Sequence, residues 1–206
     1  MARPLRIQYP GAWYHVMNRG TNRCPIFLEN QDRQHFYDVL WKSATLWKIQ
    51  IHAYSLMPNH YHLLIEELEE GGVTRFMHKL GVGYAGYFNK KYDRSGALFQ
   101  GKYKSILIER DAHFMYIPFY IHFNPLDMKF PEWRDRSIKD VRTAKKYLES
   151  YRWSSHLDYL GINSFPSVTQ RDILLDLFGG DQNYIEETQK MLESFTVDMI
   201  FDLTLE

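Results

Sequence analysis

The chain has 206 residues, in which 25 basic residues (Lys and Arg) balance 25 acidic ones, and it contains one cysteine and 16% aromatic residues. This composition excludes collagenous, coiled-coil, disordered and disulfide-stapled proteins, and the length predicts one compact domain with an appendage. No stretch approaches the ~20 apolar residues of a membrane span, and the N-terminus lacks the pattern of a signal peptide. A single thiol, Cys24, suits a reducing compartment, so we expect a cytoplasmic protein.

The first half of the chain alternates between strand and helix patterns. Residues 12–18 are aromatic and β-branched and lie between turn signals, which predicts a strand. Residues 31–48 carry apolar side chains at helical spacing. Two strands are expected next, at 49–56 and 60–66, joined by a turn that contains Pro58.

A second helix is expected from about Thr74, an extended or hairpin segment over 96–110, and a third helix from Asp111 to just before Asn124. The order strand, helix, strand, strand, helix, strand, helix predicts an α+β fold. We expect a mostly antiparallel, ferredoxin-like sheet with helices packed on one side of it.

The helical and strand patterns weaken after Pro125. Residues 131–160 form a polar connector, and two short helices are expected between 169 and 195, the first capped by Thr169 and Asp172. We therefore expect a main α+β domain over 1–130, a connector over 131–160 and an acidic helical tail over 161–206.

The balanced charge conceals a separation along the chain. Residues 1–160 hold 23 basic and 16 acidic residues, whereas residues 161–206 hold 2 and 9. The basic excess is greatest over residues 71–110, where cations alternate with aromatic side chains, a combination suited to single-stranded nucleic acid. The alternative is that these cations lie on a solvent-exposed face and that the aromatic side chains form an apolar stripe of the core. The expected DNA contacts are Arg94, Lys102 and Lys104, with Lys90 and Lys91 beside them.

His60 and His62 form the first candidate metal-ligand pair. On a strand, residues i and i+2 point to the same face about 6.8 Å apart, so both imidazoles face away from Tyr61. The alternative is a pair of exposed strand histidines. Two histidines leave coordination positions of a divalent ion unfilled, so a third protein ligand must come from elsewhere in the chain.

Tyr120 and Asn124 form a second candidate pair, four residues apart on one helix face. An amide oxygen is a hard ligand suited to Mg or Mn, and a phenol beside a metal can act as a nucleophile. The alternative is a core tyrosine followed by an Asn-Pro helix stop. Pro118 lies inside the expected helix, where it would remove a hydrogen bond and kink it.

Other motifs are assigned no function. The G-x-G-x-x-G pattern at 81–86 lies inside a helical pattern rather than after a strand, so a dinucleotide site is rejected. Cys24 is expected to be structural. Six further histidines are expected to be satisfied or solvent-facing: His15, His52, His78, His113, His122 and His156.

Two linked motifs carry a family resemblance. The segments Pro58-Asn59-His60-Tyr61-His62-Leu63-Leu64 and Tyr120-Ile121-His122-Phe123-Asn124-Pro125 resemble the IS200-like single-tyrosine transposases of the HUH endonuclease superfamily. Supporting similarities lie in residues 9–20, 98–104 and 151–155, so the resemblance covers about residues 4–160. Length and tail are most similar to the REP-associated tyrosine transposases.

The resemblance implies roles for four residues. His60 and His62 match the metal ligands of the family, Asn124 matches its third ligand and Tyr120 its nucleophile, with Mg or Mn as the ion. It implies cleavage and rejoining of single-stranded DNA near hairpins through a 5′-phosphotyrosine intermediate. Pro118 departs from the usual pattern. Monomers and dimers with exchanged tyrosines both occur in families of this kind.

Two other functions stay open. The chain could be a domesticated DNA-hairpin binder or regulator without turnover. It could also be a structural zinc or interaction module, although one cysteine cannot supply the thiolate-rich sites typical of structural zinc.

Overall fold

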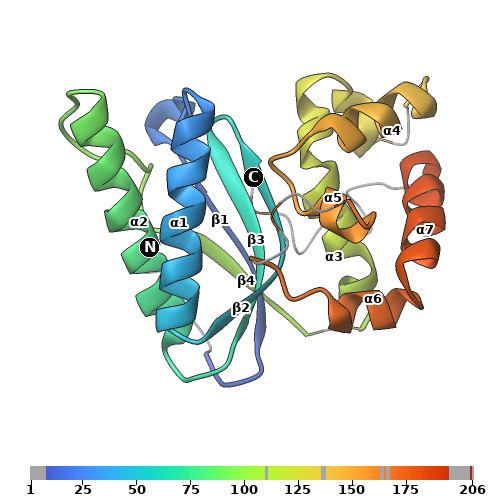
Figure 1. Ribbon diagram of the computed structural model, residues 1–206, viewed down its shortest axis with the longest axis horizontal. Helices are drawn as coiled ribbons and strands as arrows, with labels where there is room; N and C mark the ends of the chain where they lie inside the picture. The colour runs from blue at the N-terminus through green and yellow to red at the C-terminus, as the bar shows by residue number, and fades with distance from the viewer. Residues whose placement is uncertain are drawn as a thin grey trace.

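The structure is a computed structural model that describes residues 8–109, 111–135, 138–162, 165, 168–194 and 205. Its centre is a four-stranded sheet in the order β2-β3-β1-β4, with neighbouring strands antiparallel (Figure 1). This pairing and the βαββαβ order of the chain make the unit ferredoxin-like, so the predicted α+β class is confirmed. The strands are β1 (Trp13–Arg19), β2 (Ile49–Met57), β3 (His60–Glu67) and β4 (Lys104–Ile108).

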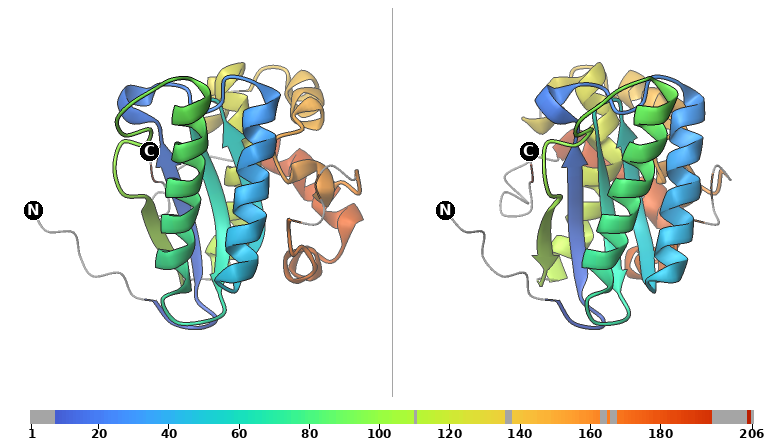
Figure 2. Two further views of the ribbon diagram at one scale, coloured as in Figure 1. Left: turned by 60° about the vertical axis from the view of Figure 1, so that its left-hand side comes forward. Right: turned by 90° about the vertical axis from the view of Figure 1, so that its left-hand side faces the viewer.

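Two long helices cover the first face of the sheet. α1 (Asn30–Leu46) and α2 (Gly72–Lys91) lie side by side over it, as Figure 2 shows. Alternate residues of β3, Tyr61, Leu63 and Ile65, point into this core, as the strand period predicts.

The second face is also covered, which corrects the expectation of helices on one side only. α3 (Asp111–Phe123) crosses this face, and four consecutive buried residues, Phe119 to His122, show that it is enclosed all round. The sheet covers one side of α3 and the C-terminal helices cover another. These are α4 (Val141–Ser150), α5 (His156–Tyr159), α6 (Asp172–Phe178) and α7 (Asp181–Ser194).

The expected third helix is confirmed, because α3 runs from Asp111 to Phe123 and continues through Pro118. Other local expectations differ from the structure. Over the described residues 96–109, the expected extended or hairpin segment contains one short strand, β4, and an isolated bridge between Phe99 and Gly20. The connector contains α4 and α5, which the polar sequence did not indicate. Three short 3-10 turns complete the chain: η1 (Thr21–Arg23), η2 (Asn124–Met128) and η3 (Pro131–Arg134).

The tail shares a hydrophobic core with α3. The ring of Tyr184 on α7 stacks on that of Phe119, with centroids 5.3 Å apart and planes inclined by 7°. On α6, Leu174 and Phe178 are buried, whereas Ile173 and Leu177 are exposed. The described helices include none long and apolar enough to cross a membrane.

Candidate active site

His60 and His62 lie at the beginning of β3, on the face that α3 covers. In the sheet register His60 is opposite Met57 and Arg19, and His62 is opposite Ser55 and Met17. The two imidazole centroids are 5.1 Å apart, and both Nε2 atoms are buried. The predicted sharing of one face is confirmed: His62 is fully buried beside α3, whereas His60 is half-buried.

Tyr120 projects from α3 toward these histidines. Its ring centroid lies 5.7 Å from that of His62 and 5.7 Å from that of His15, nearly perpendicular to both. The side chain is fully buried, and the guanidinium carbon of Arg134 lies 5.6 Å from its ring centroid. The structure therefore brings Tyr120 beside one of the two predicted ligands, despite Pro118 two residues before it.

Asn124 follows one helical turn after Tyr120. Its Nδ2 donates a hydrogen bond of 2.7 Å to the carbonyl oxygen of Tyr120, which directs the amide. Its Oδ1 is buried and has no hydrogen-bond partner among the described residues. A buried amide oxygen left unsatisfied costs about 1–3 kcal/mol, so such an atom points to a missing ligand.

The donor atoms fit a divalent cation. Two imidazole nitrogens and one amide oxygen are ligand types that Mn accepts, and the oxygen also suits Mg. In the described part of the chain, no group of three or more His, Cys, Asp or Glu side chains could hold a metal. A site at His60 and His62 would thus need a ligand of another type, and the amide oxygen of Asn124 is of such a type.

His15 is one of the histidines expected to be satisfied or solvent-facing, and the sequence did not indicate its place beside His62. Its Nε2 lies 2.8 Å from Nδ1 of His62, and both side chains are fully buried. The strand pattern alone could place His15 on one face of β1. It could not show that β1 pairs with β3 and brings the two imidazoles together.

A small cavity opens beside His60. It has a volume of about 160 Å³ and is lined by Met17, Arg19, Arg23, Asn59 and His60. Nε of Arg19 donates a hydrogen bond of 2.6 Å to Oε1 of Gln100. Two arginines therefore border the accessible side of the candidate site, and neither was singled out from the sequence.

The predicted DNA contacts lie at the same end of the sheet as His60, because β1 ends there and β3 and β4 begin there. Lys90 is exposed at the end of α2, Arg94 follows it, Lys102 precedes β4 and Lys104 begins it. The Lys104 ammonium donates a hydrogen bond to the backbone oxygen of Leu205.

Lys91 differs from its neighbours. Its ammonium contacts carboxylates at the beginning of α1, those of Glu29 and, at 2.8 Å, Asp32. The side chain is 21% exposed, and the Asp32 side chain is fully buried. Lys91 therefore joins α2 to α1, and its charge is already paired.

Most aromatic residues of the basic segment, residues 71–110, belong to the hydrophobic core between the sheet and the helices α1 and α2. Phe88, Phe99 and Tyr103 are buried in it. The hydroxyl groups of Tyr87 and Tyr92 donate to the Asp32 carboxylate over 3.2 and 2.8 Å. These aromatic residues are therefore better explained by packing in the core, the alternative given above, than by stacking on DNA bases.

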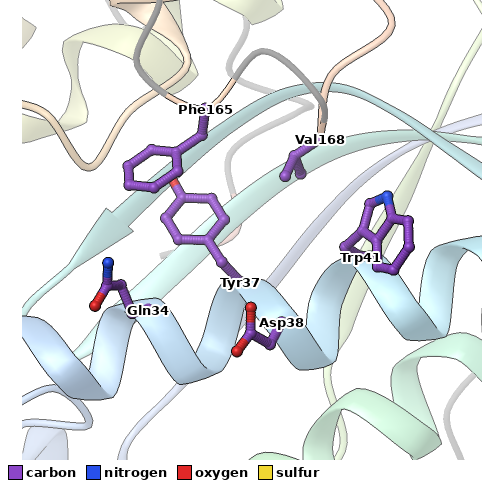
Figure 3. A pocket seen from close by; sticks show the side chains of 6 residues that line it. All are labelled: Gln34, Tyr37, Asp38, Trp41, Phe165 and Val168. Carbon is purple, nitrogen blue, oxygen red and sulfur yellow. The ribbon is translucent and has the colours of Figure 1, made fainter.

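A larger cavity, of about 450 Å³, lies over α1 (Figure 3). Tyr37 and Phe165 stack across it with centroids 4.4 Å apart, and Trp41 borders it. It contains none of the predicted site residues, and α1 covers the opposite face of the sheet from α3. It takes no part in the site around His60.

The model of the family "Transposase IS200 like" matches residues 8–124. A solved structure described as a REP-associated tyrosine transposase bound to a REP hairpin is 16% identical, with a TM-score of 0.55 over 84% of this chain and 93% of that chain. A candidate transposase of Deinococcus radiodurans R1 is 19% identical, with a TM-score of 0.41 over 59% and 94%. No protein of curated function matches. The similarity to the REP-associated tyrosine transposase structure shows that this chain shares its fold.

Proposed function

Because the chain belongs to the IS200-like transposase family, we propose that it cleaves and rejoins single-stranded DNA with Tyr120 as the nucleophile. One observation carries this proposal. The Tyr120 ring lies 5.7 Å from the ring of His62, on a helix whose next turn holds a buried amide oxygen without a described partner.

His60, His62 and Asn124 are the proposed ligands of a divalent ion, Mg or Mn. When bound, such an ion polarises the scissile phosphate and stabilises the charge that develops on its oxygens. The Nδ2 bond to the Tyr120 carbonyl fixes the amide so that Oδ1 is available as the ligand atom.

The proposed reaction is a transfer between two oxygens of one phosphorus. Oη of Tyr120 forms a bond to phosphorus while the bond from phosphorus to O3′ breaks, which leaves a 5′-phosphotyrosine and a free 3′-OH. Because the phosphodiester is conserved, the reverse reaction rejoins the strand without ATP. The phenol must lose a proton and O3′ must gain one, so the protons balance. The guanidinium of Arg134 lies over the Tyr120 ring and is already paired with the Asp127 carboxylate, at 2.6 and 2.9 Å.

Tyr120 is proposed to act in its own chain, because the tyrosine and the ligand His62 meet within one copy. This arrangement suits a monomer and requires no exchange of helices. Mixing Tyr120→Phe protein with His60→Ala protein tests it. We expect the mixture to remain inactive, whereas recovered cleavage would show exchange between copies.

The proposed substrate is single-stranded DNA beside a hairpin. The solved relative of similar fold is described as bound to a REP hairpin, and this chain places Arg19, Arg23, Lys90, Arg94 and Lys102 at the end of the sheet where His60 lies. Cations at these positions can neutralise phosphates.

A denaturation-resistant protein–DNA adduct is the direct test. The full chain is incubated with Mn²⁺ and single-stranded oligonucleotides that flank hairpins from its genomic neighbourhood. We expect an adduct that Tyr120→Phe abolishes and His60→Ala severely weakens. Tyr116→Phe, one turn earlier on α3, is the matched control and should leave the adduct intact.

Two outcomes would count against this function. An adduct that survives Tyr120→Phe would contradict the nucleophile. Hairpin binding without any adduct across a broad oligonucleotide set would favour the second candidate, a regulator that binds DNA hairpins without turnover.

A further inference from the structure

We propose that His15 is a positioning residue that orients His62 and determines which of its ring nitrogens is available to a metal. This inference rests on the proposed function, because it assigns a role toward the proposed metal site. His15 touches neither DNA nor the ion in this scheme.

The geometry is a direct contact between neighbouring strands. His15 is on β1 opposite Leu64, two residues along β3 from His62, and both imidazoles point to the α3 face. Nε2 of His15 and Nδ1 of His62 are 2.8 Å apart, and the rings are inclined by 22° with centroids 5.1 Å apart. Both side chains are fully buried, so β1 holds this contact in place.

The hydrogen bond contains one proton, and its position decides the chemistry. If Nδ1–H of His62 donates to His15, Nε2 of His62 keeps the lone pair that a metal requires. If His15 donates instead, Nε2 of neutral His62 carries a hydrogen and cannot be a ligand. Metal binding therefore requires the first arrangement, in which His15 accepts.

The same contact packs the proposed nucleophile. The Tyr120 ring meets His15 and His62 at the same centroid distance, 5.7 Å, and at nearly right angles. His15 therefore supports both the ligand and the ring that lies beside it. Partners that orient a metal-bound histidine typically change metal affinity about 10- to 100-fold when they are removed.

The first test measures Mn²⁺ binding to the full chain without DNA, by electron paramagnetic resonance of the unbound ion. We expect His15→Leu to weaken binding about 10- to 100-fold. His15→Gln should recover most of the affinity, because its Oε1 can accept from Nδ1–H of His62. Leu64→Met, a buried change of similar volume on the opposite strand, is the matched control and should bind as the unchanged chain does.

The outcomes separate the two proposals. If the unchanged chain binds no Mn²⁺, the metal site fails and the role of His15 fails with it. If the unchanged chain and His15→Leu bind equally, only the role of His15 is overturned.

A second measurement needs no variant that could misfold. Nitrogen NMR of ¹⁵N-histidine-labelled protein without metal reports the tautomer of each imidazole. We expect His62 to carry its proton on Nδ1 and His15 to accept at Nε2. A neutral His62 with its proton on Nε2 would overturn the inference.

Discussion

Replacing Asn124 is expected to affect metal binding much more than the stability of the fold, because of one buried atom. Its Oδ1 is buried and has no hydrogen-bond partner among the described residues, while its Nδ2 makes one bond to the Tyr120 carbonyl. A leucine of similar size would lose that bond but would also remove the unsatisfied oxygen. Losing the bond costs about 1 kcal/mol, and removing the oxygen relieves a similar amount if its cost is at the lower end of about 1–3 kcal/mol, so the two effects nearly cancel.

We therefore expect Asn124→Leu to change the free energy of unfolding by less than about 1 kcal/mol and to reduce Mn²⁺ affinity at least about tenfold. Denaturant titration and Mn²⁺ binding on the same preparation check both parts. If stability falls by several kcal/mol while metal affinity is kept, the oxygen has a structural partner instead.

His156 makes the stability of the protein depend on pH. Burial, with a smaller effect from Lys145, lowers the pKa of His156 to about 3, against about 6.5 for an unfolded histidine. Between these values the unfolded chain binds a proton that the folded chain does not. The stability that the neutral imidazole contributes is present above pH 6.5 and is lost as the pH falls toward 3.

From this histidine we expect the free energy of unfolding to fall by about 1.4 kcal/mol per pH unit below pH 6. Urea titrations at pH 4.5, 5.5 and 6.5 measure this dependence. His156→Gln should reduce the slope by that amount, and the exposed His78→Gln should leave it unchanged. Equal slopes in all three proteins would contradict the assignment.

At the scale of elements, one tyrosine of the tail holds the helix of the proposed nucleophile. The Tyr184 hydroxyl lies 2.7 Å from Nδ1 of His122 on α3 and 2.9 Å from Nδ1 of His156. A hydroxyl has one proton, so one imidazole accepts and the other donates. The network continues from Nε2 of His122 to Oγ of Ser155, at 2.7 Å, and through it to β2.

Tyr184→Phe removes both contacts and leaves two buried imidazole nitrogens without their partner. We expect a loss of about 1–3 kcal/mol in the free energy of unfolding. Tyr147→Phe, at a half-buried tyrosine of α4, should change it by less than about 0.5 kcal/mol. Equal effects of the two substitutions would show that the network does not bear on stability.

The elements also show which features a single sequence can predict. The period of two along β3 correctly placed His60 and His62 on one face, and helical spacing placed Tyr120 and Asn124 one turn apart. Both are local patterns. The contact between His15 and His62 depends on the register of two strands 47 residues apart in the chain, which no local period contains.

Pro118 lies inside a helix that the sequence predicted correctly, although local propensity disfavours a proline there. A proline inside a helix costs a hydrogen bond, and α3 continues through it because the sheet and the C-terminal helices bury this helix on several sides. By contrast, α4 and α5 were missed because the polar residues of the connector masked a few buried positions, such as Ala144 and Leu148.

For the whole molecule, the separation of charge along the chain becomes a separation in space. The described helices of the acidic tail pack on α3 and α4, on the opposite face of the sheet from α2. They therefore do not cover α2, where Lys90 and Lys91 lie. The tail and residues 71–110 are in contact through the bond from Lys104 to Leu205. The basic end of the sheet can thus present charge to a polyanion although the net charge is zero.

Adjacent lysines at the end of α2 provide a matched test of that surface. Lys90 is exposed, whereas Lys91 is paired with Glu29 and the buried Asp32. Each lysine that neutralises a phosphate of single-stranded DNA contributes about 0.7 to the slope of log affinity against log salt concentration.

We expect Lys90→Gln to reduce this slope by about that amount without lowering the melting temperature. Lys91→Gln should lower the melting temperature and leave the slope unchanged, because its charge already serves α1. Fluorescence anisotropy between 50 and 300 mM salt, about the range in which such contacts weaken, measures the slopes. The reverse pattern would place the DNA on the α1 side of the molecule.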